Sequence, residues 1–292
     1  MNAAEMAQGK WPGIISALIG AEIVTRKHQP CPMCGGKDRF RFTDFRGMGD
    51  WICNSCGSGN GFDLLQGVHG WDFAETAKRV EGLAGNVDPV VRRQADPLIR
   101  LRKIQAGLGP IGREVKRYLA GRGLIGKWGR IYEHPALRYY GDTSATYPAM
   151  AAKATDVNDR PVTYHLTYLQ NGKKAPVESP KKIMTPNGKL MGSAVRLGRG
   201  ERIAVTEGIE TGMAVMNRTG LPTWAALSAN GMKQLQIPDL VTHVSIYGDN
   251  DHSYTGQAAA LDLAQRLHRE GKVVEVYTPS QPGTDWADEW AN

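Results

Sequence analysis

The chain has 292 residues, of which 41% are hydrophobic, and its formal net charge is +7. This length allows two or three domains with packed cores, and the composition excludes a collagen-like or low-complexity chain. No apolar run approaches the roughly 20 residues that span a bilayer, and the first residues lack the features of a signal peptide. We therefore expect a cytoplasmic protein that does not enter a membrane.

The charge is distributed unevenly along the sequence. Residues 92–130 contain 11 basic and 2 acidic side chains, residues 153–202 contain 10 and 4, and residues 203–292 contain 5 and 11. A basic middle region joined to an acidic C-terminal region predicts a groove for a polyanion that leads to a cluster of carboxylates with bound metal ions. The alternative is two solvated surfaces of opposite charge.

The N-terminal part is predicted to be a small metal-binding module between helices. Residues 11–24 have helical apolar spacing, and short helices are expected at residues 61–66 and 71–80. Between them lie two Cys-x2-Cys pairs separated by 18 residues. This spacing is typical of a structural zinc ribbon, and a reducing compartment favours metal over disulfides. The expected ligands of the structural Zn²⁺ are Cys31, Cys34, Cys53 and Cys56.

The segment between the cysteine pairs has an alternating pattern of charge and aromaticity. In a strand, Arg39 and Arg41 would share one face, and Phe40 and Phe42 the other. Arginines and aromatic rings on a rigid ribbon suit single-stranded nucleic acid, so both arginines are candidate template-binding residues. The phenylalanines either stack on bases or form the core of the ribbon, and we favour the core. Trp51 is open to the same two interpretations.

The middle of the chain is predicted to mix helices and strands. Two prolines and little periodicity make residues 85–97 the expected linker. Helices are predicted over residues 98–106 and 113–120. Strands are predicted over residues 147–157 and 161–169, and Asn171-Gly172 is typical of a hairpin turn.

From residue 203 onward, strands alternate with helices. This order predicts a parallel sheet with helices on its faces. The expected strands are 203–206, 223–226, 241–247 and 272–278, and the expected helices are 210–218, a short one near Met232, and 256–270.

Acidic residues follow three of these strands. Glu207 follows the first strand, Asp249 and Asp251 follow the third, and Asp285 and Asp288 come after the last. Because the carboxyl ends of parallel strands lie at one edge of the sheet, the acids should converge there. Any one of them could instead be a helix cap or a surface charge. Convergent carboxylates suit two divalent cations, Mg²⁺ or Mn²⁺, that orient a triphosphate.

Both halves of the chain resemble known families. The pattern Glu207-Gly208, then Asp249-Asn-Asp251, then a later acidic group resembles the Toprim domain of bacterial-type primases, topoisomerases and some nucleases. The zinc segment, Cys31-Pro-Met-Cys-Gly-Gly-Lys-Asp-Arg-Phe-Arg-Phe42 followed by Gly49-Asp-Trp-Ile-Cys-Asn-Ser-Cys-Gly57, is similar to the zinc ribbon of phage and satellite-phage primase-helicases. Residues 118–124 and 179–184 resemble segments that precede the Toprim domain in such primases. One departure is the glycine after Asp251, which comes only at Gly256 and lengthens that loop.

The resemblance implies a fold class and a domain order. We expect an α/β protein with a Toprim catalytic domain, which is a Rossmann-like parallel sheet, behind an α+β subdomain and an N-terminal zinc ribbon. The expected parts are a zinc-ribbon template-binding domain at residues 1–84, a linker at 85–97, a basic subdomain at 98–202 and the Toprim domain at 203–292.

The resemblance also implies an activity, a DNA-dependent RNA primase that uses single-stranded DNA and ribonucleoside triphosphates in phage, plasmid or other mobile-element replication. Glu207, Asp249 and Asp251 would be catalytic and hold magnesium, with Asp285 and Asp288 completing the catalytic set. Expected nucleotide- or template-binding residues are Lys181, Lys182, Lys189 and Arg122, together with Arg39 and Arg41 of the ribbon.

Three alternatives remain open. The same acids could serve a Toprim nuclease, although the zinc segment argues against it, and a topoisomerase is disfavoured because gate domains are lacking. A non-catalytic adaptor that binds single-stranded DNA is the third. No Gly-x4-Gly-Lys-Ser/Thr occurs in the sequence, so we expect no helicase motor here, and a separately encoded replicative helicase is a candidate partner.

Overall fold

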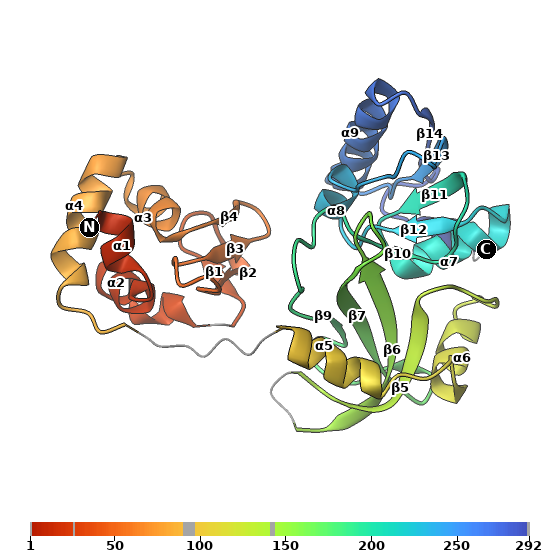
Figure 1. Cartoon of the computed structure of the whole chain (residues 1–292), viewed down its shortest axis with the longest axis horizontal. Coiled ribbons are helices and arrows are strands. Elements are labelled where there is room, and N and C mark those ends of the chain that lie inside the picture. The colour runs from red at the N-terminus through yellow and green to blue at the C-terminus, as the bar shows by residue number, and fades with distance from the viewer. Residues whose placement is uncertain (1, 26, 90–96, 141–143, 291–292) are drawn as a thin grey trace. The chain divides into compact units, whose positions relative to one another are not determined.

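The computed structural model describes residues 2–25, 27–89, 97–140 and 144–290. The chain divides into two compact units, residues 1–94 and residues 95–292, and each is described by itself (Figure 1). Within the described ranges, no helix is long and apolar enough to cross a bilayer. Residues 90–96 of the expected linker lie outside these ranges.

The first unit is a small four-stranded sheet flanked by helices. The expected helix over residues 11–24 is divided, because Gly20 has φ 150° and separates a helix from a short 3₁₀ turn. Asn60 and Asp72 cap the two helices that follow the sheet, each accepting a backbone N–H with its side chain. The elements are α1 (Ala3–Ala7), α2 (Trp11–Leu18), the 3₁₀ turn (Ala21–Val24), β1 (Gln29–Cys31), β2 (Gly35–Phe42), β3 (Trp51–Cys53), β4 (Gly57–Gly59), α3 (Gly61–His69) and α4 (Phe73–Ala84).

Aromatic side chains form the core of this unit. Phe40 and Phe42 are fully buried, and Phe40 stacks on Trp51 with ring centroids 6.0 Å apart. Trp11 meets Phe62 edge to face at 4.9 Å. The core interpretation is therefore confirmed for both phenylalanines and holds for Trp51 as well, because buried rings cannot stack on bases.

The second unit begins with helices and an antiparallel group of strands. The predicted turn is confirmed, since Asn171 and Gly172 have φ 54° and 72° and join two paired strands. The strand over residues 131–138 was not predicted. The elements are α5 (Pro97–Ala106), α6 (Arg113–Ala120), β5 (Ile131–Arg138), β6 (Thr146–Thr155), β7 (Pro161–Gln170), β8 (Lys173–Lys174), β9 (Lys181–Ile183) and β10 (Ala194–Arg196).

The remainder of this unit is the predicted parallel sheet with its helices. Strands run parallel in the order β14-β13-β11-β12, and β10 pairs antiparallel with both β12 and β6. The predicted basic subdomain and the C-terminal domain thus share one ten-stranded sheet within the described residues. The elements are β11 (Arg202–Thr206), α7 (Ile209–Thr219), β12 (Thr223–Ala225), α8 (Ala229–Lys233), β13 (His243–Tyr247), α9 (Thr255–Arg269), β14 (Val273–Tyr277) and α10 (Trp286–Glu289).

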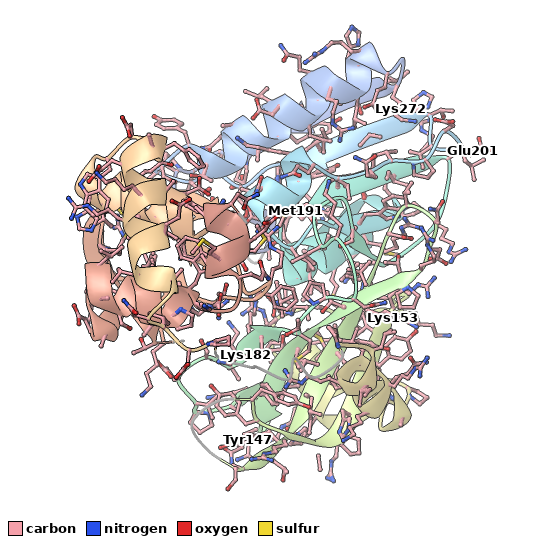
Figure 2. The ribbon with its side chains drawn as sticks, turned by 60° about the vertical axis from the view of Figure 1, so that its left-hand side comes forward. Tyr147, Lys153, Lys182, Met191, Glu201 and Lys272 are labelled. Carbon is pink, nitrogen blue, oxygen red and sulfur yellow. The ribbon has the colours of Figure 1, made fainter. Side chains whose placement is uncertain are left out.

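The amino ends of the parallel strands are tied together by hydrogen bonds. Lys272, ahead of β14, is buried, and its Nζ donates to the carbonyl oxygens of Val241 and Pro238 at 2.7 and 3.2 Å. Glu201, ahead of β11, accepts the N–H of Thr242 through its carbonyl at 2.8 Å. Figure 2 labels Glu201 and Lys272 at this edge. Hydrogen bonds to main-chain carbonyl groups therefore hold the amino edge together, and the acidic side chains follow the strands at the opposite edge.

Candidate functional site

Three of the predicted acids share a cavity at the carboxyl edge of the parallel sheet. The cavity has a volume of about 260 Å³, and its lining includes Glu207, Asp249 and Asp285. Glu207 follows β11, Asp249 lies just beyond β13, and Asp285 immediately precedes α10. The structure therefore brings together side chains separated by up to 78 positions along the sequence.

The surroundings of Glu207 oppose the ionisation of its carboxyl group. Burial raises the pKa of its carboxyl group, and the charge of Asp251 raises it further. A hydrogen bond from the backbone of Ala229, at the start of α8, lowers the pKa and offsets part of this effect. The carboxylates of Glu207 and Asp251 thus repel each other, and a bound cation would reduce this repulsion.

The longer loop after Asp251 still places that residue beside α9. Asp251 Oδ2 accepts the N–H of Gly256 at 2.8 Å, and a Cβ on Gly256 would lie 2.8 Å from the carbonyl oxygen of Asp249. Only glycine fits this close approach. Asp251 is not part of the cavity lining, although its charge reaches Glu207.

The last predicted acids are described in part. Asp285 accepts hydrogen bonds from Thr211 Oγ1 at 3.1 Å and from the N–H of Ala287 at 2.8 Å. Both bonds orient its carboxylate. Asp288 lies in α10, and its side chain is outside what the structure describes.

The donor chemistry of the acidic residues fits a divalent cation. Carboxylate oxygens are the ligands that Mg²⁺ prefers, and Glu207, Asp249 and Asp251 supply only such oxygens. Their carboxylate oxygens do not, however, lie close enough together to coordinate a single ion as the side chains stand. Within the described part of the chain, four cysteines are the sole group whose ligand atoms lie within reach of a single ion.

A partly buried ion pair borders the same cavity. Glu210 in α7 is 8% exposed, and its carboxylate accepts hydrogen bonds from Lys181 Nζ and Tyr118 Oη, each at 2.5 Å. The predicted nucleotide-binding residue Lys181 therefore lies in the cavity, but its charge is shared with Glu210. The sequence gave no sign of this pair.

Two polar residues of β7 were missed by sequence reasoning. His165 and Thr167 line the cavity, two positions apart on one face of the strand. The alternation of Thr163, His165 and Thr167 within an otherwise apolar strand is the signal that could have identified them. Buried polar side chains are uncommon, and one without a hydrogen-bond partner needs an explanation such as a bound ligand or water.

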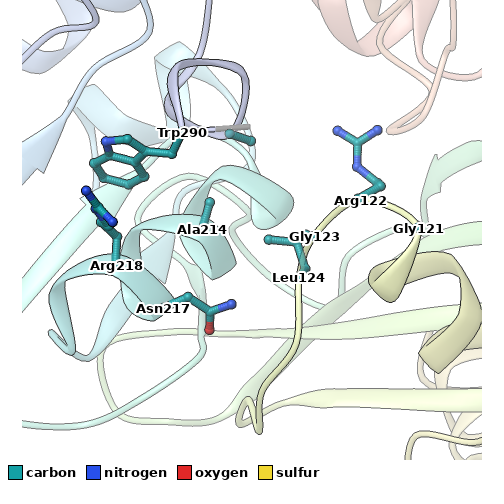
Figure 3. Close-up of a pocket in the computed structure, with 9 residues that line it drawn as sticks. Gly121, Arg122, Gly123, Leu124, Ala214, Asn217, Arg218 and Trp290 are labelled. Atoms are coloured by element: carbon teal, nitrogen blue, oxygen red, sulfur yellow. The ribbon is translucent and has the colours of Figure 1, made fainter. Parts of the chain in front are cut away.

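The other predicted basic residues lie outside this cavity. Lys182 Nζ is 5.3 Å from the ring centroid of Tyr139, and Lys189 lines a separate cavity of about 510 Å³. Arg122 lines a pocket of about 620 Å³ in which Arg218 and Trp290 lie on the other side (Figure 3). The charge of Arg122 also lowers the pKa of Glu210, so this pocket lies near the partly buried ion pair.

The four cysteines form the predicted zinc site. Their Sγ atoms lie within 4.8 Å of one another, with Cys31 to Cys56 at 3.9 Å and Cys34 to Cys53 at 3.7 Å. A tetrahedron with Zn–S bonds of about 2.3 Å has sulfur atoms about 3.8 Å apart, so the spacing fits Zn²⁺. All four thiols are free of disulfides.

The two ribbon arginines lie close to this site. Arg39 Nη1 is 4.0 Å from the Sγ of Cys34, which directs its guanidinium toward the metal site. Arg41 is half-buried, and its Nε atom has no hydrogen-bond partner among the described residues.

Three family models match successive parts of the chain. Residues 202–292 match the Toprim domain, residues 26–62 match the zinc-binding domain of primase-helicase, and residues 98–197 match a domain of unknown function (DUF7146). The Toprim match contains Glu207, Asp249 and Asp285, and the zinc-binding match contains all four cysteines. The sequence assignments of a Toprim domain and a primase zinc ribbon are thus confirmed.

Similar solved structures are primases. The zinc-binding and RNA polymerase domains of the Aquifex aeolicus primase match with 14% identity and a TM-score of 0.44, over 98% of this chain and 81% of that one. A DNA primase domain from Pseudomonas aeruginosa matches with 17% identity and a TM-score of 0.41, over 66% and 72%. The DnaG primase catalytic domain bound to ssDNA matches with 14% identity and a TM-score of 0.41, over 66% and 74%.

Proposed function

Since this chain is a primase-type protein, with a zinc ribbon at residues 26–62 and a Toprim domain at residues 202–292, we propose that it is a DNA-dependent RNA primase. It joins ribonucleotides on a single-stranded DNA template, and a 3′-hydroxyl attacks an α-phosphate with release of pyrophosphate. The observation that carries this proposal is one cavity whose lining includes three acidic residues, Lys181 and two polar residues of β7. The acidic residues are Glu207, Asp249 and Asp285, and the residues of β7 are His165 and Thr167.

The acidic residues would hold the catalytic metal. Glu207, Asp249 and Asp251 provide hard oxygen ligands for Mg²⁺ or Mn²⁺. When bound, the cation would neutralise phosphate charge and lower the pKa of the attacking hydroxyl. Burial and the charge of Asp251 raise the pKa of Glu207, which makes its carboxylate a stronger base. It is therefore placed to accept the proton that the 3′-hydroxyl loses.

Basic residues around the cavity would hold the polyanionic partners. Lys181 lies in the cavity, and Arg122 lines the adjoining pocket. Lys182 and Lys189 belong to the same basic segment and would contact the template farther out. Contacts of this kind make binding strongly dependent on salt concentration.

The proposal assigns a role to each part of the chain. Residues 1–84 bind template through the ribbon and its Arg39 and Arg41, residues 85–97 link the parts, residues 98–202 carry basic contacts, and residues 203–292 perform the chemistry. A separately encoded helicase would unwind DNA for such an enzyme, in the setting of a phage, plasmid or other mobile element.

One assay distinguishes this function from its alternatives. The full chain is incubated with single-stranded DNA, labelled ribonucleoside triphosphates and Mg²⁺, beside a cleavage control with labelled DNA. Labelled RNA oligomers indicate a primase, shortened DNA indicates a nuclease, and neither product indicates a binding adaptor. Asp249→Ala that keeps its fold and still makes primers would rule out the assigned site.

A further inference from the structure

Two polar side chains in the floor of the cavity have no hydrogen-bond partner among the described residues. They are His165, through its buried Nδ1 atom, and Thr167, through Oγ1. Thr167 is completely buried, and both residues line the cavity that contains Glu207 and Asp249. A buried polar atom without a partner is unfavourable unless a ligand or water supplies one.

The next polar residue on the same face of β7 shows what an ordinary structural role looks like. Thr163 Oγ1 donates to the carbonyl oxygen of Met184 at 2.7 Å, and Thr163 is not part of the cavity lining. The strand therefore satisfies a buried threonine where there is no cavity. His165 and Thr167 are left without partners where the cavity begins.

The charge of these groups indicates which ligand atoms they suit. Burial, followed by the charge of Lys181, lowers the pKa of His165 to about 4, so its ring is neutral near pH 7. A neutral imidazole and a hydroxyl can each donate and accept a hydrogen bond. Phosphate oxygens mainly accept, whereas sugar hydroxyls do both. Phosphates are also better served by Lys181 and by cations at the acidic edge.

We propose that His165 and Thr167 bind the ribose hydroxyls of the nucleotide in this cavity and so set a preference for ribonucleotides over deoxyribonucleotides. This inference rests on the proposed nucleotide chemistry of the same site. It adds the part of the substrate that β7 recognises. Both residues lie on β7, which pairs with β6 and β9 in the ten-stranded sheet, so the backbone of the subsite is held by the fold.

The test measures binding of unreacted nucleotide to the full chain. Titration calorimetry with Mg²⁺ compares ATP, 2′-deoxy-ATP and inorganic tripolyphosphate. The wild type should bind ATP on the order of tenfold more tightly than 2′-deoxy-ATP, as expected when a buried group loses its partner. Thr167→Val keeps the shape of the side chain and removes its hydroxyl. It should weaken the binding of ATP but not of 2′-deoxy-ATP, and so bring the ratio of the two affinities toward one. His165→Leu should act in the same direction.

Two further variants serve as controls. Thr167→Ser keeps the hydroxyl and should keep most of the ratio even if it loses some stability. Thr163→Val removes a buried hydroxyl of the same strand outside the cavity and should leave the ratio unchanged. Thermal unfolding of each variant identifies any that fail to fold, and the comparison then rests on whichever of Thr167→Val and His165→Leu keeps its fold.

Three outcomes would overturn the inference. The wild type could bind ATP and 2′-deoxy-ATP equally, or the ratio of the two affinities could be unchanged in both Thr167→Val and His165→Leu. The variants could also lose the same affinity for ATP as for tripolyphosphate, which would indicate a phosphate contact.

The proposed function is tested separately, by primer synthesis. A wild type that prefers ATP over 2′-deoxy-ATP but makes no primers refutes primase activity and supports the ribose subsite. If the chain makes primers and both variants keep the wild-type affinity ratio, the subsite alone is refuted.

Discussion

Lys181 Nζ lies 2.5 Å from Glu210 Oε2, and this ion pair joins β9 to α7 beside the acidic cavity. Tyr118 of α6 donates to the other oxygen of the same carboxylate. Burial alone would raise the pKa of Glu210, but the charge and hydrogen bond of Lys181 outweigh it and hold the pKa below its usual value. Three elements far apart in the sequence are therefore connected through one ionised carboxylate.

Replacing Lys181 by methionine should destabilise the protein in a pH-dependent way. The Lys181 side chain is 39% exposed, so solvent screens the pair, and we expect a loss of about 1–3 kcal/mol at pH 7. Because the folded pKa of Glu210 is lowered, its stabilising contribution is present above the unfolded pKa and is lost as pH falls through the folded pKa. Urea unfolding of both proteins between pH 7 and pH 4 measures this.

Lys182→Met is the matched control on the same strand. Lys182 contacts the ring of Tyr139 rather than a carboxylate, so its loss should have a smaller effect that does not vary over this pH range. A difference between the wild type and Lys181→Met that stays constant from pH 7 to pH 4 would contradict the role of the ion pair.

Glu207→Gln should abolish primer synthesis without weakening the fold. Removing a carboxylate from the site should reduce the rate by at least about 100-fold, the scale seen when one electrostatic group at a transition state is lost. The pKa of Glu207 is raised, so the wild type loses stability as pH rises through that pKa, and the glutamine variant should lack this decline. Primer yield at pH 7, and thermal unfolding over a series of pH values up to pH 7 without divalent cations, measure the two effects.

A Glu207→Gln protein that is clearly less stable than the wild type would show that the carboxylate has a structural role. In that case its loss of activity would not identify a catalytic group. Asp262→Asn, on the surface of α9 in a pair with Lys233, is a suitable control, since it removes a Toprim carboxylate away from the cavity.

The sequence predicted the parallel sheet more completely than the antiparallel part. Strands β11, β13 and β14 are apolar runs that alternate with helices, and such runs carry their own signal. β5 was missed because it contains Pro135, which argues against a strand; the structure accommodates it where the register shifts between His134 and Leu137. β10 is only three residues long, too short for a periodic pattern.

The sequence could predict those residues of the site whose location follows from the order of the strands alone. Glu207 and Asp249 could be placed because they follow parallel strands, whose carboxyl ends must meet. The pair of Glu210 with Lys181 was not predictable, because it depends on how β9 and α7 pack. Tyr118 lies 92 positions from Glu210. The role of His165 and Thr167 of β7 likewise could not be predicted, because it depends on the cavity that the folded chain forms beside them.

Divalent cations should stabilise the second unit through the acidic edge. A cation that binds the folded chain and not the unfolded chain raises the midpoint of thermal unfolding, and the shift grows with the logarithm of the cation concentration above Kd. We expect millimolar Mg²⁺ or Mn²⁺ to raise the wild-type midpoint by a few degrees, a shift of the size produced by about 1–2 kcal/mol in a unit of this length. Asp249→Asn should lose most of this shift.

Asp262→Asn should keep the shift, because its carboxylate is paired with Lys233 outside the cavity. Calorimetric scans with and without the metal chloride at constant ionic strength separate specific binding from screening. An equal shift in the wild type and Asp249→Asn would place the cation elsewhere.

Loss of zinc should unfold the ribbon and leave the second unit intact. The ribbon is a four-stranded sheet with a small aromatic core, and its ligands hold β1 to β3 together, so Zn²⁺ supplies much of its folding free energy. All four cysteines belong to the first compact unit. Cys53→Ser should therefore increase amide hydrogen exchange around Phe40 and Trp51 but leave β6 and β7 protected.

The same variant tests what the ribbon contributes to function. If the ribbon reads template, Cys53→Ser should impair initiation on natural templates while Mg²⁺ still shifts the unfolding midpoint, because the acidic edge lies in the other unit. Full initiation by the unfolded-ribbon variant would restrict the zinc module to a structural part. Loss of the Mg²⁺ shift as well would show that the two units depend on each other, contrary to their separate cores.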